Sequence, residues 1–238
     1  MKNLPNFYYE KKIVEKGYEV IAGLDEAGRG SLAGPLVCAA AVFRGSFSEI
    51  VKQASKDGIK INDSKKLTEG ERKKAYSWIR KNAFSFGVGV SSVSEINRYG
   101  IAKATFSGFR RAIREVEKRV RRRVNFILID AFYVPYIGGI RMPKKTTRKA
   151  NRKTKKVKIE GGQLAIIHGD EKSFSIAAAS IIAKVYRDKI MKKMSRLAAY
   201  KKYNWEKNKG YGTQDHLLAL KKFGLTKEHR PSFIHLKP

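Results

Sequence analysis

Two adjacent carboxylates follow an apolar run near the start of the chain. Residues 20–24 read V-I-A-G-L, and Asp25 and Glu26 come directly after them. The chain carries 52 Lys and Arg against 21 Asp and Glu, a net charge of +31, so paired acids here differ from their surroundings. Carboxylates are ligands that Mg²⁺ prefers, which indicates a metal site. The alternative is a solvated turn in which Gly28 and Gly30 supply backbone freedom.

Two further acids stand at the ends of predicted elements. Asp130 ends a strand predicted for residues 125–129, and Asp170 precedes a long predicted helix. In a mixed α/β sheet such positions can converge on one edge, where carboxylates repel one another unless cations neutralise them. If Asp130 and Asp170 lie close to Asp25 and Glu26, their proximity would therefore itself indicate a metal site. About five helical turns separate Asp188 from Asp170, so we expect Asp188 to form an ion pair or to support the site from outside.

The positive charge is spread along the chain and predicts a polyanionic partner. The densest run, residues 141–158, holds ten basic residues and no acid, and subtracting these ten from +31 still leaves +21. Nucleic acid is the usual partner of such a protein, bound through its phosphates. A basic body with a small acidic centre favours phosphodiester hydrolysis with metal ions. The run 141–158 is predicted to be a mobile loop, either a clamp on duplex DNA or a solubilising insertion.

Composition argues against other classes of protein. No stretch approaches the ~20 apolar residues of a membrane span. The N-terminus has no apolar signal-peptide core, so we expect a cytoplasmic protein. Cys38, the single cysteine, lies in an apolar run and is expected to be a core residue. With 238 residues, 42% of them hydrophobic, the chain can form one large domain with a small appendage.

The elements that must position the acids alternate between strands and helices. Thr68 and Glu71 have the spacing of a capping box, and the long helix after Asp170 contains no breaker. We expect a domain at residues 1–200 and a small helical lobe at 201–238. Strands are predicted at 19–24, 36–43, 84–90, 125–129 and 163–168, and helices at 68–81, 94–120 with a break near 99–100, 173–200 and 213–223.

Six sequence strings occur in order along nearly the whole chain. They are G-L-D-E-A-G-R-G-S-L-A-G-P, N-D-S-K-K-L-T, I-L-I-D-A, G-D-E-K-S-F-S-I-A-A-A-S-I-I-A-K-V-Y-R-D, K-G-Y-G-T-Q-D-H and H-R-P-S-F. In this order they resemble ribonuclease HII, the type 2 ribonuclease H family. The resemblance implies an α/β fold, a ribonuclease-H-like mixed β-sheet flanked by helices, with a small helical C-terminal extension.

The same resemblance implies a metal-dependent endoribonuclease. Such an enzyme uses Mg²⁺ or Mn²⁺ in a two-metal mechanism to cut the RNA strand of RNA/DNA hybrids. It also nicks 5′ of single ribonucleotides in duplex DNA, leaving 5′-phosphate and 3′-hydroxyl ends, a step of ribonucleotide excision repair. A monomer with these nucleic acids as partners is expected. The metal ligands fall on Asp25, Glu26, Asp130 and Asp170, the acids that the pattern already selects.

Substrate choice must depend on the ribose 2′-hydroxyl, which distinguishes RNA from DNA. The resemblance gives this role to the backbone of Gly28, Arg29 and Gly30 and to Tyr211, whose ring would stack at the following sugar. Glycines on both sides of Tyr211 favour a turn tip over a core position. Phosphate contacts are expected from Lys65, Lys66, Lys172, Lys184, Lys209 and Arg230.

The sequence departs from the family pattern at two places, and two other functions are compatible with it. Ser31 stands where the family usually has proline, and the run 141–158 is longer and more basic than usual. One alternative is a non-catalytic nucleic-acid-binding module with structural acids. The other is ribonuclease HIII, which discriminates poorly for single ribonucleotides. No extra N-terminal domain is obvious, and Tyr211 also supports HII.

Overall fold

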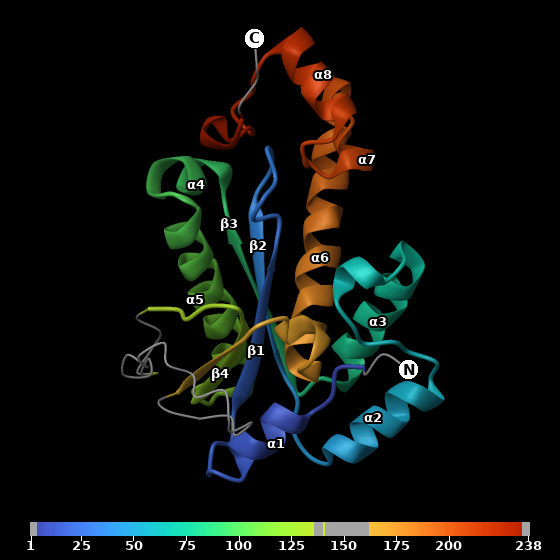
Figure 1. The fold of residues 1–238 in the computed structure, drawn as a ribbon, viewed down its shortest axis with the longest axis vertical. Coiled ribbons are helices and arrows are strands. Elements are labelled where there is room, and N and C mark those ends of the chain that lie inside the picture. Colours follow the sequence, from blue (N-terminus) through green and yellow to red (C-terminus); the bar gives the residue numbers. More distant parts are fainter. Residues whose placement is uncertain (1–3, 136–139, 141–161, 235–238) are drawn as a thin grey trace, which may run out of the picture.

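A five-stranded mixed sheet forms the centre of the molecule (Figure 1). The computed structural model describes residues 4–135, 140 and 162–234, so the basic run 141–158 lies outside the described residues. The strand order is β3-β2-β1-β4-β5. Strand β2 is antiparallel to β1 and β3, as predicted for the first pair, and β4 is parallel to β1 and β5. The strands are β1 (Ile21–Ala27), β2 (Leu36–Val42), β3 (Ser85–Ser91), β4 (Phe126–Asp130) and β5 (Gln163–Ile166).

Helices cover both faces of this sheet (Figure 1). Helices α4 (Val93–Tyr99) and α5 (Ile101–Val120) lie on one face, and α3 (Glu69–Asn82) and α6 (Phe174–Ser195) lie on the other. Every residue of β2 is buried, because a strand covered on both faces can be apolar throughout. Cys38 is among these buried residues, which confirms it as a core residue. The α/β fold predicted from the sequence is confirmed.

Local signals define several helix ends as predicted. Thr68 and Glu71 form the expected capping box at the start of α3. The break near residues 99–100 is also present, where Gly100 adopts a positive φ between α4 and α5. Three short helices were not predicted from the sequence, namely α1 (Tyr8–Val14), α2 (Phe47–Lys56) and α7 (Trp205–Asn208).

Helix α1 fixes the beginning of α6. Glu10 is buried, and its Oε1 accepts hydrogen bonds from the hydroxyls of Ser173 and Ser175 at 2.7 and 2.6 Å. It also accepts one from the Ser175 backbone N–H at 3.0 Å. A carboxylate at a helix N-terminus is favoured by the helix dipole. The first turn of α6, three residues after Asp170, is thereby held against the N-terminal segment.

The C-terminal lobe is built on the end of α6. Helix α6 stops at Ser195, so the predicted end at Tyr200 is wrong. Tyr200 instead packs on Trp205, with ring centroids 4.9 Å apart, and that contact requires the chain to turn away. Ala33 and Met191 join the same apolar cluster, so the lobe shares its core with the main body. It contains α7 (Trp205–Asn208) and α8 (Gln214–Phe223), the latter close to the predicted helix.

The described residues include no helix that is both long enough and apolar enough to cross a membrane.

Candidate active site

Asp25 lies within β1 and is buried, with 8% of the residue's surface exposed. Its Oδ1 accepts a hydrogen bond from the Glu26 backbone N–H at 2.8 Å, and this N–H and the Ser180 hydroxyl of α6 both lower the pKa of the carboxyl. Burial raises the pKa of Asp25 well above its usual value, and the charges of Glu26 and Asp170 raise it further. The first predicted acid is therefore a buried carboxyl whose charge is opposed by two neighbours.

Asp130 and Asp170 are brought together by the parallel strands β4 and β5. Asp130 pairs with Ile166 in the sheet register, and its Oδ1 accepts a hydrogen bond from the Gly169 N–H at 2.7 Å. Asp170 follows at once in a single 3₁₀ turn. Strand ends meet at one edge of a sheet, which is why residues 40 positions apart can adjoin.

Asp63 is an acid of this site that the sequence analysis missed. It caps a short 3₁₀ turn, η1 (Ser64–Lys66), and this turn is tied to α6 by a 3.0 Å hydrogen bond between the hydroxyls of Ser64 and Ser180. Burial, the charge of Asp63 and the charge of Asp130 raise the pKa of Asp170 to about 6. The available signal was the string N-D-S-K-K, in which an acid stands just before two lysines. In the structure Asp63 is buried, with 7% of its surface exposed.

These five carboxylates, Asp25, Glu26, Asp63, Asp130 and Asp170, are called the acid cluster below. Burial raises the pKa of Glu26, and Asp130 adds to that rise, while Arg29 at 3.5 Å opposes it. Burial alone would lower the pKa of Lys65, yet the charges of Asp63, Asp170, Asp25 and Asp130 raise it. The negative charges of the cluster thus raise the pKa of neighbouring acids and of Lys65.

The acid cluster fits a divalent cation in its chemistry. A bound Mg²⁺ or Mn²⁺ requires hard oxygen ligands, and it relieves the repulsion between neighbouring carboxylates. Over the described part of the chain, no three Asp, Glu, His or Cys side chains already stand in the arrangement of a metal site. Glu26 instead pairs with Arg29, and Asp130 with the Gly169 N–H. A cation would compete with these partners for the carboxylate oxygens.

Asp188 does not join the acid cluster. Its Oδ1 accepts a hydrogen bond from the Lys184 Nζ at 2.8 Å, one turn earlier on α6. The expected ion pair is therefore present. Ser180, Lys184 and Arg187 lie on one stripe of α6, because positions separated by four and seven residues share a helix face.

A buried arginine from that stripe holds the loop of residues 28–35, called the 28–35 loop below. Arg187 donates from Nε to the Pro35 carbonyl at 3.0 Å and from Nη2 to the Ala33 carbonyl at 3.1 Å. Gly28 has φ +90°, and a Cβ there would stand 1.9 Å from the Arg187 Nε. Only glycine fits this position without displacing the guanidinium. A Cβ at Gly30 would meet nothing within 4 Å, so its backbone is open to a ligand.

The expectation that Arg230 contacts phosphate is wrong. Arg230 is fully buried and donates to the carbonyls of Gly28 at 2.8 Å, Arg29 at 3.1 Å and Gly34 at 2.7 and 3.1 Å. Burial and, to a smaller extent, the neighbouring charge of Arg187 lower the pKa of Arg230 to about 9. Its side chain fixes the loop from inside, because main-chain carbonyls use its donors.

Tyr211 lies beside the 28–35 loop. A sugar-binding site made of Tyr211 and the backbone of Gly28, Arg29 and Gly30 would require this proximity. The N–H groups of Leu32 and Ala33 donate to the Gly210 carbonyl at 2.8 and 3.1 Å. The Tyr211 ring centroid is 5.2 Å from the Arg187 Cζ and 5.6 Å from the Lys184 Nζ. The ring is part-exposed, so Tyr211 is not a core residue.

Buried histidines support the Tyr211 turn. The His216 Nδ1 lies 2.9 Å from the Tyr211 carbonyl oxygen, which requires a proton on that nitrogen. The His216 Nε2 then accepts from the Trp205 Nε1 at 3.1 Å and lies 3.2 Å from the His229 Nε2. Burial lowers the pKa of His229 to about 4, so both rings are neutral near pH 7.

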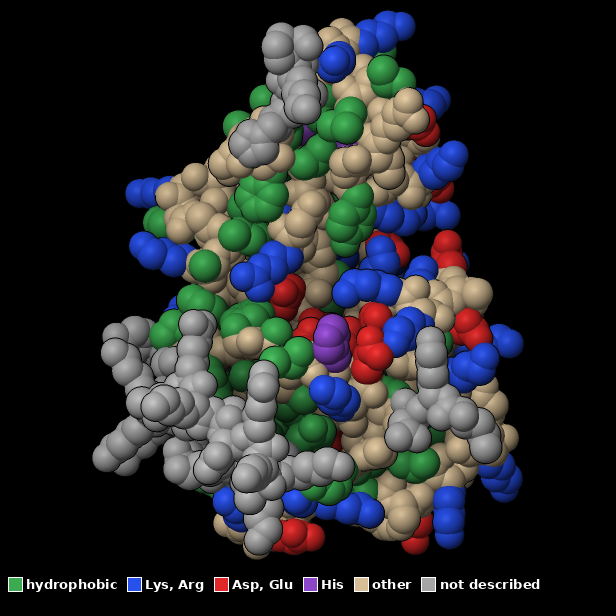
Figure 2. All heavy atoms as spheres, in the orientation of Figure 1, with side chains coloured by type: hydrophobic (Ala, Val, Ile, Leu, Met, Phe, Trp, Pro, Cys, Tyr) green, Lys and Arg blue, Asp and Glu red, His purple; other side chains and the backbone are tan. Residues whose placement is uncertain are grey.

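The other predicted phosphate contacts lie at different places. Lys65 adjoins the acid cluster, and Lys184 lies over Tyr211. Lys172 is exposed and donates to the Ile167 carbonyl at 2.7 Å, Lys66 pairs with Glu171, and Lys209 donates to the Glu206 carbonyl. Figure 2 shows acidic side chains gathered near the middle of one face, with Lys and Arg around them and over much of the remainder.

A mixed sheet with acids at its strand ends, set in a basic surface, is the arrangement of the ribonuclease-H-like nucleases. The family model described as ribonuclease HII matches residues 22–236. The ribonuclease HII of Caldanaerobacter subterraneus subsp. tengcongensis is 41% identical over 227 residues, which cover 95% of this chain and 79% of that protein. The chain belongs to the ribonuclease HII family, and it is a ribonuclease H-type endoribonuclease.

Solved structures agree on the fold. The ribonuclease HII in the PCNA complex from Archaeoglobus fulgidus matches with a TM-score of 0.62 at 23% identity, covering 92% of this chain and 97% of that one. Bst-RNase HIII in complex with Mn²⁺ matches with a TM-score of 0.55 at 20% identity, covering 87% and 63%. At these identities the matches show the architecture alone.

Proposed function

We propose that this endoribonuclease cuts the RNA strand of RNA/DNA hybrids and nicks duplex DNA 5′ of a single ribonucleotide. The supporting observation is that the acid cluster and the 28–35 loop adjoin. Glu26 is two residues from Gly28. Ser180 of α6 acts on the pKa of Asp25, and Lys184, one turn later on α6, lies over the Tyr211 ring. That separation is about 6 Å of helix, so a strand at the acids can present its sugar to the loop.

The acids Asp25, Glu26, Asp130 and Asp170 would hold Mg²⁺ or Mn²⁺. When bound, divalent ions lower the pKa of a water and stabilise the leaving 3′ oxygen. The chain's own part is to hold the carboxylates in fixed positions: the Gly169 N–H donates to Asp130, and the Glu26 N–H donates to Asp25. Asp63 contributes negative charge at Asp170, which favours a cation there.

Recognition of the ribose would use the open backbone at Gly30 and the ring of Tyr211. Gly30 is exposed and has open space where a side chain would stand, so a 2′-hydroxyl can approach its backbone. Tyr211 offers an aromatic face whose position the His216 and Gly210 contacts fix. Lys65, whose pKa the acids of the cluster raise, and Lys184, which lies over the Tyr211 ring, are the proposed phosphate contacts.

Family membership decides against a non-catalytic binding module, and the family model is that of HII. The enzyme is proposed to act in the cytoplasm as a monomer on nucleic acid.

Cleavage by an Asp130→Asn variant tests the proposed metal site. A labelled DNA duplex with one ribonucleotide is incubated with Mg²⁺, and nicking and binding are measured separately. Removing one ligand should lower the nicking rate by roughly 10²-fold or more, since metal stabilisation is worth several kcal/mol. Binding should remain, because the basic surface is unchanged.

Asp188→Asn is the matched control. It makes the same chemical change on an acid that pairs with Lys184 and lies outside the acid cluster. Its nicking rate should stay within about threefold of the unaltered enzyme, because the change removes no ligand of the proposed metal site. Equal rates for the Asp130→Asn variant and the unaltered enzyme would refute the assignment of Asp130.

A further inference from the structure

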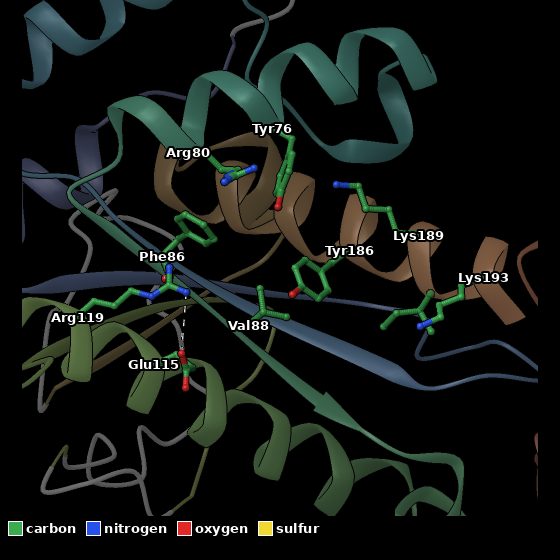
Figure 3. A pocket seen from close by; sticks show the side chains of 10 residues that line it. Tyr76, Arg80, Phe86, Val88, Glu115, Arg119, Tyr186, Lys189 and Lys193 are labelled. Carbon is green, nitrogen blue, oxygen red and sulfur yellow. Dashed lines mark hydrogen bonds and ion pairs between the residues drawn. The ribbon is translucent and has the colours of Figure 1, made fainter.

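A groove runs along the free edge of the sheet, away from the proposed active-site residues. Strand β3 is the last strand on its side of the sheet, and the groove beside it encloses about 870 Å³. Helices α3 and α6 supply one wall and α5 supplies the other, as Figure 3 shows. The groove contains none of the acids of the cluster and no residue of the 28–35 loop.

Within the described residues, Val88 is a position on the β3 edge of this groove where neither outward backbone group is paired. Arg119 donates to the Phe86 carbonyl at 2.8 Å and Arg111 to the Val90 carbonyl at 2.6 Å, so these residues direct their backbone groups away from β2. Val88 lies midway and faces the same way, because backbone direction alternates along an antiparallel strand. Neither its N–H nor its carbonyl has an outward partner among the residues described. An edge of this kind accepts another strand.

The groove is positively charged from three helices. Arg80 extends from α3, Arg119 from α5, and Lys189 and Lys193 from α6 (Figure 3). Glu115 is the one acid in the lining, and its pair with Arg119 is long, at 4.0 Å, and half-exposed. Exposed pairs of this kind contribute little. An occupant with carboxylates or phosphates would gain contacts on both walls.

Backbone and ring geometry favour a peptide over a nucleic acid strand. The Tyr76 ring is covered by Lys189 at 4.8 Å and Arg80 at 5.8 Å, and the Phe86 ring by Arg119 at 4.8 Å. Base stacking would have to displace these cations. A phosphodiester also has no N–H for the Val88 carbonyl, whereas an extended peptide supplies both a donor and an acceptor.

We propose that the β3 groove binds an extended acidic segment of a partner protein by strand addition at Val88. The backbone of the segment pairs with the Val88 N–H and carbonyl, and its carboxylates face Arg80, Lys189 and Lys193. The contact is separate from cleavage and does not depend on the proposed metal site. Its consequence is a docking surface that stays available while the enzyme holds nucleic acid.

The test uses an eight-residue peptide of alternating Val and Glu, titrated into the full chain at about 0.15 M salt. Fluorescence anisotropy measures affinity, and the amide NMR signal of Val88 reports strand pairing. A Lys189→Glu/Lys193→Glu variant should weaken binding by roughly tenfold or more, because like charges oppose the peptide. The matched control, Lys74→Glu/Lys81→Glu, makes the same charge change at exposed lysines outside this groove and should change affinity less than twofold.

A second peptide separates strand pairing from charge alone. Methylation of alternate backbone nitrogens keeps every carboxylate but removes the N–H groups, so binding should fall and the Val88 signal should not move. Equal affinity for both peptides, or equal weakening by the two charge variants, would overturn the proposal. Binding of an eight-nucleotide oligothymidylate at Val88 with no peptide binding would also overturn it and assign the groove to nucleic acid.

Discussion

The acid cluster and the 28–35 loop are neighbours in the chain, but their charges are balanced in opposite ways. In the cluster, burial and mutual repulsion raise the pKa of Asp25, Glu26 and Asp170, and Lys65 is the nearby cation that these acids act on. Beside the loop, Arg187 and Arg230 are fully buried, yet main-chain carbonyls of the loop accept hydrogen bonds from both. The first region has fewer nearby cations, Lys65 and Arg29, than acids, whereas the guanidiniums of the second region have hydrogen-bond partners within the protein.

This difference indicates what each region does. Unbalanced buried carboxylates are destabilising unless an ion or substrate binds, so their retention points to chemistry. Buried guanidiniums with carbonyl partners fix a loop in one conformation. The comparison predicts that losing a buried arginine costs stability, whereas losing an acid of the cluster does not.

Arg230→Met should give the largest effect on stability. The carbonyls of Gly28 and Gly34 would lose their donors, which should lower the free energy of unfolding by about 2 to 4 kcal/mol. Urea denaturation measures the change. Arg29→Met, in the same loop but with a side chain 45% exposed, is the control and should cost less than about 0.5 kcal/mol. Similar losses for both would show that the buried hydrogen bonds do not stabilise the loop.

Tyr211→Ala should act on substrate choice more than on folding. Loss of ring stacking should slow nicking at a single ribonucleotide by roughly 10- to 100-fold, since a stacking contact is worth about 1 to 3 kcal/mol. Cleavage of a long RNA/DNA hybrid should fall less, because it offers many registers. Single-turnover rates on the two substrates give the ratio.

Tyr186→Ala is the matched substitution for that experiment. Tyr186 lies in the β3 groove, is 40% exposed, and should leave the ratio of the two rates unchanged. Tyr211→Phe separates the hydroxyl from the ring. An unchanged rate for Tyr211→Ala at the single ribonucleotide would remove Tyr211 from recognition.

Asp170→Asn should stabilise the metal-free protein slightly at neutral pH. A carboxyl whose pKa rises from 3.8 to about 6 on folding binds its proton more tightly in the folded state. Stability from this group is therefore present below about pH 4 and is lost as pH rises through 6. The variant avoids that loss and should gain about 1 kcal/mol at pH 7, within the maximum of about 3 kcal/mol that such a shift allows.

Thermal unfolding in EDTA at pH 4 and pH 7 measures this difference. The gain should be absent at pH 4 and should shrink when Mg²⁺ is added at pH 7, because the ion stabilises the unaltered site. Asp188→Asn should show no such gain, since Lys184 pairs with that acid. A gain of the same size at both pH values would contradict a role for ionisation.

Local patterns in the sequence predicted most of the elements. The capping box at Thr68, the break at Gly100 and the strand that ends on Asp130 each depend on residues close together in the chain. The end of α6 was misplaced because Tyr200 turns away to meet Trp205. Helices α1, α2 and α7 were missed. Helix α1 is held by a carboxylate, Glu10, that bonds residues more than 160 positions away.

The sequence by itself determined the family, the acids at the ends of β1 and β4, and the glycine-flanked Tyr211, because these are properties of residue type and local order. Only the tertiary structure decided which distant side chains meet. It placed Asp63, and not Asp188, beside Asp170, and it turned Arg230 inward to the loop carbonyls. A charged residue has the same letter whether its partner is solvent, a carbonyl or another charge, and burial and contact settle which of these it is.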